Sequence, residues 1–197
     1  HGISGVIDAE PPFPGGILEL ASHVVFSWPG LKKFTGLTEI KAALIQADQD
    51  LPGWVAVTDG RRGCYYINPA GLVHENAFKV KVVDTLAAGD VWHGAFALSL
   101  GEGESEVNAV RFANAVAALK CTGFGGRSAI PNRLETNTFL QKQILATNPK
   151  PLEIARMHAM LCYRTPESFK LRFNRTVNED LGVFNVESWL THHGEKL

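Results

Sequence analysis

The sequence predicts an α/β fold with three layers, in which one sheet is covered by helices on both of its faces. Short apolar runs of strand length alternate with longer segments whose apolar residues recur at helical spacing. The alternation favours parallel pairing among the early strands, and a tight turn after Thr58 favours a hairpin. The predicted strands are residues 3–8, 23–27, 54–58, 64–67 and 79–83.

The first elements follow from apolar runs and from the breaks between them. Residues 3–8 form a short apolar run that ends in an acid, and a stretch rich in proline and glycine follows. A short helix over 17–21 precedes the strand at 23–27. Two helical stretches come next, one around Leu31 and one over 39–47. The second carries apolar residues at helical spacing, so we expect one of its faces to pack inward.

The later elements include a hairpin and three helices. Residues 59–63 form a turn between the strand at 54–58 and the strand at 64–67, and Gly71 marks the next turn. Residues 79–83 alternate charged and apolar side chains, which is typical of a half-exposed strand. The predicted helices are residues 89–100, 105–121 and 132–145.

The sequence pattern divides the chain into a domain and a tail. We expect residues 1–146 to form the α/β domain and residues 147–197 to form a tail of unassigned role. Pro149 and Pro151 break the last predicted helix, and the tail then shows only a candidate helix over residues 152–161.

Composition and charge limit the classes of function. Apolar residues make up 45% of the chain and charged residues 20%, as in a soluble globular protein. The formal net charge of -1 gives no basic surface for nucleic acid. No apolar run is long enough to cross a bilayer and no signal-peptide pattern is present, so we expect no membrane association and a cytoplasmic location. The three cysteines, Cys64, Cys121 and Cys162, are too widely spaced to indicate a disulfide framework or a zinc site.

The strongest functional pattern lies between the end of a predicted strand at Asp84 and the start of a predicted helix beside Asp90. Three small residues, Ala87, Ala88 and Gly89, lie where the helix begins. Small side chains let backbone N–H groups approach a ligand, and a helix N-terminus adds free donors. We expect an anion hole for a transferred phosphoryl group, with Asp90 as the general base for a substrate hydroxyl. Taken alone, an aspartate here is more often a helix N-cap, and only the surrounding spacing favours the catalytic interpretation.

That spacing resembles the C-terminal signature of the ribokinase-like, PfkB-type carbohydrate kinases. The matching run is Asp84-Thr85-x-Ala87-Ala88-Gly89-Asp90-x-x-x-Gly94-Ala95-Phe96. The resemblance implies that Asp90 is the catalytic base and that the amides of residues 88–90, in the same turn as Ala87, form the anion hole. It also implies a site for a monovalent cation such as K⁺ beside Asp84 and the Leu86 carbonyl, which some members use and others do not.

Two further segments stand in the order that this resemblance requires. Residues 57–63 resemble the strand-end T-x-G-x-x-G of the family, and residues 111–131 resemble the loop that wraps the adenine. The contacts with the nucleotide are therefore expected from Thr58, Gly60, Gly63, Thr85, Asn114, Gly125 and Gly126. Taken alone, the first segment is more often a plain hairpin, and the second a buried alanine-rich helix with a glycine-rich connection.

The resemblance covers about residues 3–146 and implies both a fold and a reaction. The fold is a three-layer, Rossmann-like sheet of the ribokinase type, whose N-terminal sugar-binding half and lid are expected to be missing from this chain. The reaction is transfer of the γ-phosphoryl group of Mg·ATP to a hydroxyl of a sugar or sugar derivative. The resemblance also implies that the full-length protein can form a homodimer through its lid. Members carry N-x-x-E where this chain has Ser27-Trp28-Pro29-Gly30, so two side chains that help to organise Mg²⁺ are lacking.

Other functions stay open at this point. Nucleoside kinases share the same signature, so the substrate class is not fixed. Without a lid and a sugar-binding wall, the chain alone is expected to be weakly active or inactive. A nucleotide-binding module that has lost catalysis, or a truncated product with no activity, is then the alternative, and ATP binding without turnover would favour the module.

Overall fold

The computed structural model describes residues 5–13, 16–147, 150–151, 177–178 and 183–184. The chain divides into two compact units, His1–Asn137 and Thr138–Leu197. The described part of the second unit includes a strand pair, β6 (Val177–Asn178) with β7 (Val183–Phe184). The candidate helix over residues 152–161 and Cys162 lie outside the described residues, and the predicted domain boundary near residue 147 stays a prediction.

The first unit contains a mixed sheet in the order β1-β2-β3-β4-β5. Its strands are β1 (Val6–Ala9), β2 (His23–Ser27), β3 (Trp54–Thr58), β4 (Cys64–Asn68) and β5 (Gly71–Glu75). The first three pair in parallel, and the last two pairings are antiparallel. The predicted parallel pairing of the early strands and the predicted hairpin after Thr58 are therefore both confirmed.

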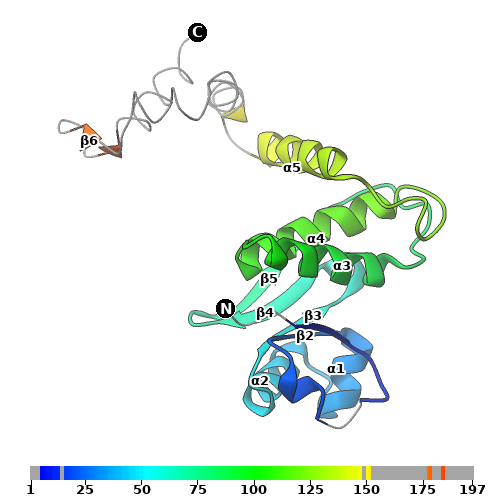
Figure 1. Cartoon of the computed structure of the whole chain (residues 1–197), viewed down its shortest axis with the longest axis vertical. Coiled ribbons are helices and arrows are strands. Elements are labelled where there is room, and N and C mark those ends of the chain that lie inside the picture. Colours follow the sequence, from blue (N-terminus) through cyan, green and yellow to red (C-terminus); the bar gives the residue numbers. More distant parts are fainter. Residues whose placement is uncertain (1–4, 14–15, 148–149, 152–176, 179–182, 185–197) are drawn as a thin grey trace. The chain divides into compact units, whose positions relative to one another are not determined.

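Helices cover both faces of this sheet (Figure 1). One face carries α1 (Trp28–Thr35) and α2 (Ile40–Asp50), and the other carries α3 (Ala88–Gly101) and α4 (Glu106–Lys120). The described helices also include α5 (Arg133–Thr147) and the short 3-10 turns η1 (Leu18–Leu20) and η2 (Gly60–Arg62). The three-layer α/β prediction is confirmed. None of the described helices is long and apolar enough to cross a membrane.

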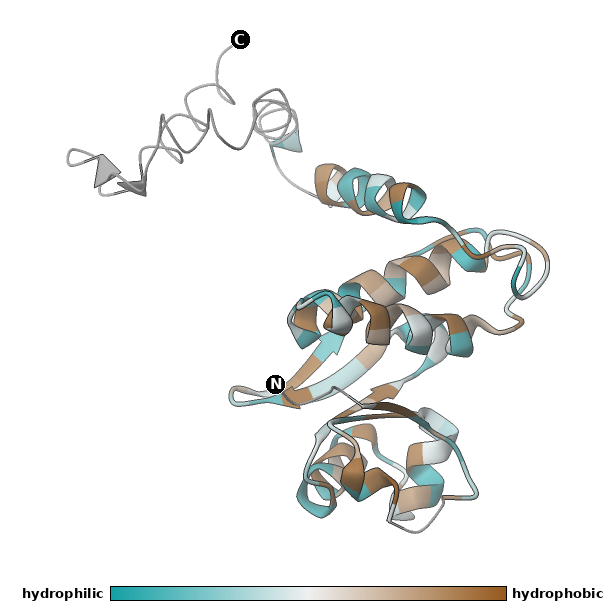
Figure 2. Cartoon of the chain, in the orientation of Figure 1, coloured by the Kyte–Doolittle hydropathy of each residue, from teal (hydrophilic) through white to brown (hydrophobic). Residues whose placement is uncertain are grey.

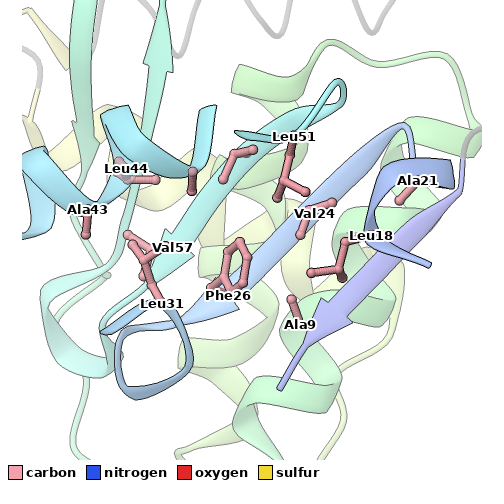
Figure 3. Close-up of a cluster of buried hydrophobic side chains, with 12 residues drawn as sticks. Ala9, Leu18, Ala21, Val24, Phe26, Leu31, Ala43, Leu44, Leu51 and Val57 are labelled. Atoms are coloured by element: carbon pink, nitrogen blue, oxygen red, sulfur yellow. The ribbon is translucent and has the colours of Figure 1, made fainter. Parts of the chain in front are cut away.

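Alternation along the strands explains the two-sided core. Successive side chains of a strand point to opposite faces of a sheet. In β2, Val24 and Phe26 pack with Leu31 and Leu44 of the α1–α2 layer (Figure 3), whereas Val25 packs with the α3–α4 layer. The strands between the two layers are accordingly mostly apolar, and the helices are mixed in hydropathy (Figure 2).

Local sequence sets where the helices begin and end. The Ser27 hydroxyl accepts a hydrogen bond from the Gly30 N–H at 3.0 Å and caps α1, which ends at Gly36 with φ of 74°. The Glu39 carboxylate caps α2 through two backbone N–H groups, and the Ser105 hydroxyl caps α4. The starts of α2 and α4 lie within a residue of the predicted ones, whereas for α1 only the position around Leu31 was predicted.

The prediction of a strand over residues 79–83 is wrong. These residues are irregular, and the last strand of the sheet is β5, which pairs with β4 in a second hairpin that was not predicted from the sequence. The Val83 N–H and the Asp84 N–H both donate to the Cys121 carbonyl, at 2.8 and 3.2 Å, so the chain here is held by the end of α4. Its alternating apolar side chains face a cavity instead of a neighbouring strand.

Candidate active site

Asp84 is the first residue of the turn that leads into α3, which we call the functional turn (residues 84–90). Its carboxylate connects this turn with the loop around Gly125 through hydrogen bonds. The Oδ1 atom accepts a hydrogen bond from the Leu86 N–H and the Oδ2 atom accepts one from the Gly125 N–H, both at 2.9 Å. These two bonds, with a smaller contribution from the charge of Lys120, hold the pKa of the Asp84 carboxyl below its ordinary value. An ionised Asp84 therefore fixes the turn to the glycine-rich loop around Gly125.

Ala87 turns the chain into α3. Its φ of 59° lies in the left-handed region, where a residue other than glycine is strained. Ala87 is the N-cap of α3, and an alanine has no side-chain atom that could cap the first N–H groups of the helix. Asp90 is the third residue of α3, so the structure does not give it the N-cap position that was the alternative interpretation.

The first amides of α3 differ in their hydrogen bonding. The Ala88 N–H donates to the Thr85 carbonyl at 3.1 Å. Within the part of the chain that the structure describes, the N–H groups of Gly89 and Asp90 have no backbone acceptor. Two free donors at a helix N-terminus can bind an anion, whereas the sequence led us to expect three such amides.

The Asp90 side chain is exposed and lines a cavity of about 520 Å³ together with Ala87 and Gly126. Its charge also acts on Asp8, at the end of β1. Burial raises the pKa of the Asp8 carboxyl, the neighbouring His93 opposes this rise, and the negative charges of nearby acids, Asp90 among them, add to it. Asp90 therefore lies open to a substrate beside a second carboxylate.

His93 connects the start of α3 to β1 and β2. Its Nδ1 atom lies 2.8 Å from the Gly89 carbonyl oxygen, and its Nε2 atom lies 3.3 Å from Asp8 Oδ1 and 3.4 Å from the Val25 carbonyl oxygen. All three partner atoms are oxygens that accept hydrogen bonds, so the ring links the first turn of α3 to β1 and β2. His93 is not one of the predicted site residues: its spacing of three residues from Asp90 on a helix indicates that it could face the site, but a histidine at such a position is more often packed or at the surface.

A larger cavity of about 650 Å³ gathers most of the predicted nucleotide contacts. Its lining includes the predicted residues Thr58, Gly60, Gly63, Thr85, Ala88, Gly89 and Asn114. The irregular segment after β5 supplies one wall, through Phe78, Val80 and Val82. The volume is that of a typical site for a small ligand, with apolar walls suited to a planar base. Gly125 and Gly126 do not line this cavity.

The turn between β3 and β4 depends on its glycines. Gly63 has φ of 97°, and a Cβ atom there would lie 2.1 Å from the Glu75 carbonyl oxygen. Gly60 has φ of 51°, with open space around the position of a Cβ atom. The Asp59 carboxylate accepts two hydrogen bonds from the Arg62 guanidinium, at 2.5 and 3.0 Å, which braces the turn beside the cavity.

Asn114 lines the cavity, but its polar atoms are used within the protein. Its Oδ1 atom accepts a hydrogen bond from Trp92 Nε1 at 2.7 Å. Its Nδ2 atom lies 3.3 and 3.2 Å from the carbonyl oxygens of Glu75 and Asn76, to which it donates. The side chain therefore joins α3, α4 and the segment after β5, and it shapes the cavity wall.

Lys120 is a site residue that was not predicted from the sequence. Its side chain is fully buried, and its Nζ atom donates to the Asp84 carbonyl at 3.0 Å and lies 3.9 Å from Asp84 Oδ2. The ammonium thus lies beside the residue at which a monovalent cation was expected. A lysine at a helix C-terminus is common, so the sequence carried no signal of this contact.

Gly30 takes the position where an acid was expected for Mg²⁺. A Cβ atom at Gly30 would lie 2.9 Å from the Ala9 carbonyl oxygen and 3.2 Å from Glu10 Oε2. A side chain would not fit there without a shift, and the Glu10 carboxylate lies in the adjoining space. In the described residues, no group of three or more His, Cys, Asp or Glu side chains could hold a metal ion.

Comparison with known proteins gives one consistent result. The model of the family "pfkB family carbohydrate kinase" matches residues 4–133. The ribokinase of Bacillus subtilis is 37% identical over 89 residues, which are 45% of this chain and 30% of that protein. The ribokinase of Staphylococcus aureus is 28% identical over 148 residues, which are 70% of this chain and 48% of that protein. The chain thus spans a third to a half of the length of these curated relatives.

Solved structures give the same picture. The ribokinase of Thermotoga maritima superposes with a TM-score of 0.64 and 33% identity, over 69% of this chain and 48% of that one. The Arabidopsis thaliana ribokinase in complex with ribose and ATP has a TM-score of 0.64 and 25% identity, over 70% and 47% of the two chains.

Proposed function

The chain belongs to the pfkB family of carbohydrate kinases, and on that premise we propose that its protein transfers the γ-phosphoryl group of ATP to a hydroxyl of a sugar or sugar derivative. One observation carries the proposal: the free N–H groups of Gly89 and Asp90 and the exposed Asp90 carboxylate lie in the same first turn of α3. Donors for a phosphate and an acceptor for a proton are thus placed side by side.

The chemistry follows from this arrangement. The Asp90 carboxylate takes the proton of the acceptor hydroxyl while the oxygen of that hydroxyl forms a bond with the γ-phosphorus. The bond between that phosphorus and the bridging oxygen breaks at the same time, and ADP leaves with the electron pair. The free amides of Gly89 and Asp90 donate to the phosphoryl oxygens, where negative charge must be stabilised by donors already in position.

The cavity of about 650 Å³ is our candidate for the nucleotide site. Its lining includes Thr58, Gly60 and Gly89 as well as the apolar Val80 and Val82. Gly89, which carries one of the free amides, is among the lining residues, so this cavity adjoins the candidate phosphate site. The ribokinase of Arabidopsis thaliana, solved with ribose and ATP, supports both ligand classes for this fold.

The chain's residues fit Mg²⁺ only in part. When bound, the ion would neutralise charge on the phosphates, which supply most of its ligands together with water. Gly30 offers no carboxylate, so we assign to Glu10, in the adjoining space, the role of orienting the waters of the ion.

Calorimetry and a coupled assay test the proposal. ATP or ADP should bind the chain with a stoichiometry near one, and the full-length gene product should consume ATP with at least one member of a panel of pentoses, hexoses and nucleosides. Absence of nucleotide binding would refute the site. Binding without turnover on any acceptor would support the second candidate, a nucleotide-binding module, which the missing acid at Gly30 favours.

A further inference from the structure

Lys120 carries a buried charge that the proposed reaction does not use. It is the last residue of α4, and its side chain has no exposed surface. Lysines are almost never fully buried unless their charge is paired, because an ammonium without partners is costly to remove from water. Here the hydrogen-bond acceptor and the counter-charge both come from Asp84.

Hydrogen bonds from both the side chain and the backbone at the end of α4 hold Asp84. The Lys120 ammonium donates to the Asp84 carbonyl, and the next carbonyl along the chain, that of Cys121, accepts the N–H groups of Val83 and Asp84. The Asp84 carboxylate in turn accepts a hydrogen bond from the Leu86 N–H, three residues before Gly89, the first of the two free amides. Asp84 therefore links the Lys120 ammonium to the functional turn through hydrogen bonds.

The oxygen atoms around the Lys120 ammonium are of the kinds that bind small cations. Carboxylate and carbonyl oxygens are the ligands that hard cations take from proteins. Asp84 presents one oxygen of each kind to Nζ, at 3.9 and 3.0 Å. A free cation bound at the same oxygens would lie next to the ammonium, where two like charges repel each other at close range.

We propose that the Lys120 ammonium is a built-in monovalent cation, so that this turn needs no K⁺ to bind phosphate or to support transfer. The statement about transfer rests on the proposed function, whereas the statement about the cation site does not. A tethered ammonium neutralises Asp84 permanently and cannot be lost by dilution of the salt. The chain is thus predicted to differ from family members that use a monovalent cation at this position.

The unmodified chain tests this directly. Its melting temperature and its affinity for ADP are measured in potassium chloride and in tetramethylammonium chloride of the same ionic strength, since that cation is too large for the site. The proposal expects the same melting temperature in both salts and dissociation constants for ADP that agree within about twofold. A melting temperature or an ADP affinity that rises specifically with K⁺ would overturn it.

Two variants separate charge from volume. Lys120→Ala removes the ammonium and leaves a space beside Asp84, whereas Lys120→Met removes the charge and keeps most of the volume. Both should melt about 5 °C lower, because each loses the charge-assisted hydrogen bond that the buried ammonium donates to the Asp84 carbonyl. Only Lys120→Ala should regain melting temperature in potassium chloride. Lys33→Ala, at an exposed position of α1, is the matched control and should melt as the unmodified chain does.

The outcomes can be told apart from those of the proposed function. If ADP fails to bind in either salt, the nucleotide site is wrong, yet the response of the melting temperature to K⁺ still decides the role of Lys120. If Lys120→Ala melts at the temperature of Lys33→Ala, the ammonium is not integral to the turn and the proposal is overturned. If neither Lys120 variant folds, the unmodified chain decides: equal melting temperatures in the two salts support the proposal, and a higher one in K⁺ overturns it.

Discussion

Asn114 offers the sharpest test of how the cavity wall is held. Asn114 is 5% exposed and Trp92, its hydrogen-bond donor, is 4% exposed, so little solvent reaches the bonds that Asn114→Ala removes. Leaving the buried Trp92 N–H without an acceptor costs about 2 kcal/mol, and losing the two longer bonds to Glu75 and Asn76 costs about 0.5 kcal/mol each. We therefore expect the free energy of unfolding to fall by about 3 kcal/mol.

Chemical denaturation followed by tryptophan fluorescence, with a thermal scan, measures this change. A loss of about 3 kcal/mol corresponds to a melting temperature about 10 °C lower. Asn108→Ala is the matched control on the same helix, because its exposed amide donates to the Glu104 side chain and the loss of this bond should cost under about 0.5 kcal/mol. If the two variants lose equal stability, the buried network does not hold the wall and the reasoning fails.

Three further predictions test the turn, the carboxylates and the metal. Gly63→Ala should lower the free energy of unfolding by about 3 kcal/mol in urea denaturation, because its Cβ would meet backbone, whereas Gly60→Ala, in open space, should cost about 1 kcal/mol. Because the pKa of the Asp84 carboxyl is lowered in the fold, its ionised form stabilises the fold at pH values above the ordinary pKa of 3.8, and this contribution is lost as the pH falls through the folded pKa. In acid titrations over this pH range, the free energy of unfolding of Asp84→Asn should therefore fall less steeply than that of the unmodified chain. In the full-length gene product, Glu10→Gln should raise the Mg²⁺ concentration for half-maximal activity severalfold, and an unchanged Mg²⁺ requirement, equal to that of the exposed control Glu19→Gln, would remove Glu10 from the metal site.

Local patterns were sufficient to predict most of the fold. The strands at 23–27 and 54–58 match β2 and β3 to the residue, because buried strands of a parallel sheet are continuous apolar runs. The strand predicted over 79–83 failed for a physical reason. Alternating apolar side chains indicate that one side of a segment is buried, and a cavity wall satisfies that pattern as well as a sheet does.

The candidate site was predictable only where its residues are close in sequence. The run from Asp84 to Asp90 specified a turn into a helix, and the structure has that turn, with Ala87 in the left-handed conformation. The contact between Lys120 and Asp84 joins residues 36 positions apart, and nothing in the neighbourhood of either residue indicates the other. Long-range polar contacts of this kind require coordinates.

The central claim is that Asp90 accepts the proton while the neighbouring amides hold the phosphate. The most direct measurement compares the unmodified full-length gene product with its Asp90→Asn variant, by turnover on the accepted sugar and by calorimetry with ATP. We predict that kcat falls by about a thousandfold or more, since a general base contributes about 10²–10⁴ and the amide cannot take a proton, while the dissociation constant of ATP stays within about twofold. Turnover by Asp90→Asn at a rate close to that of the unmodified protein would contradict the account.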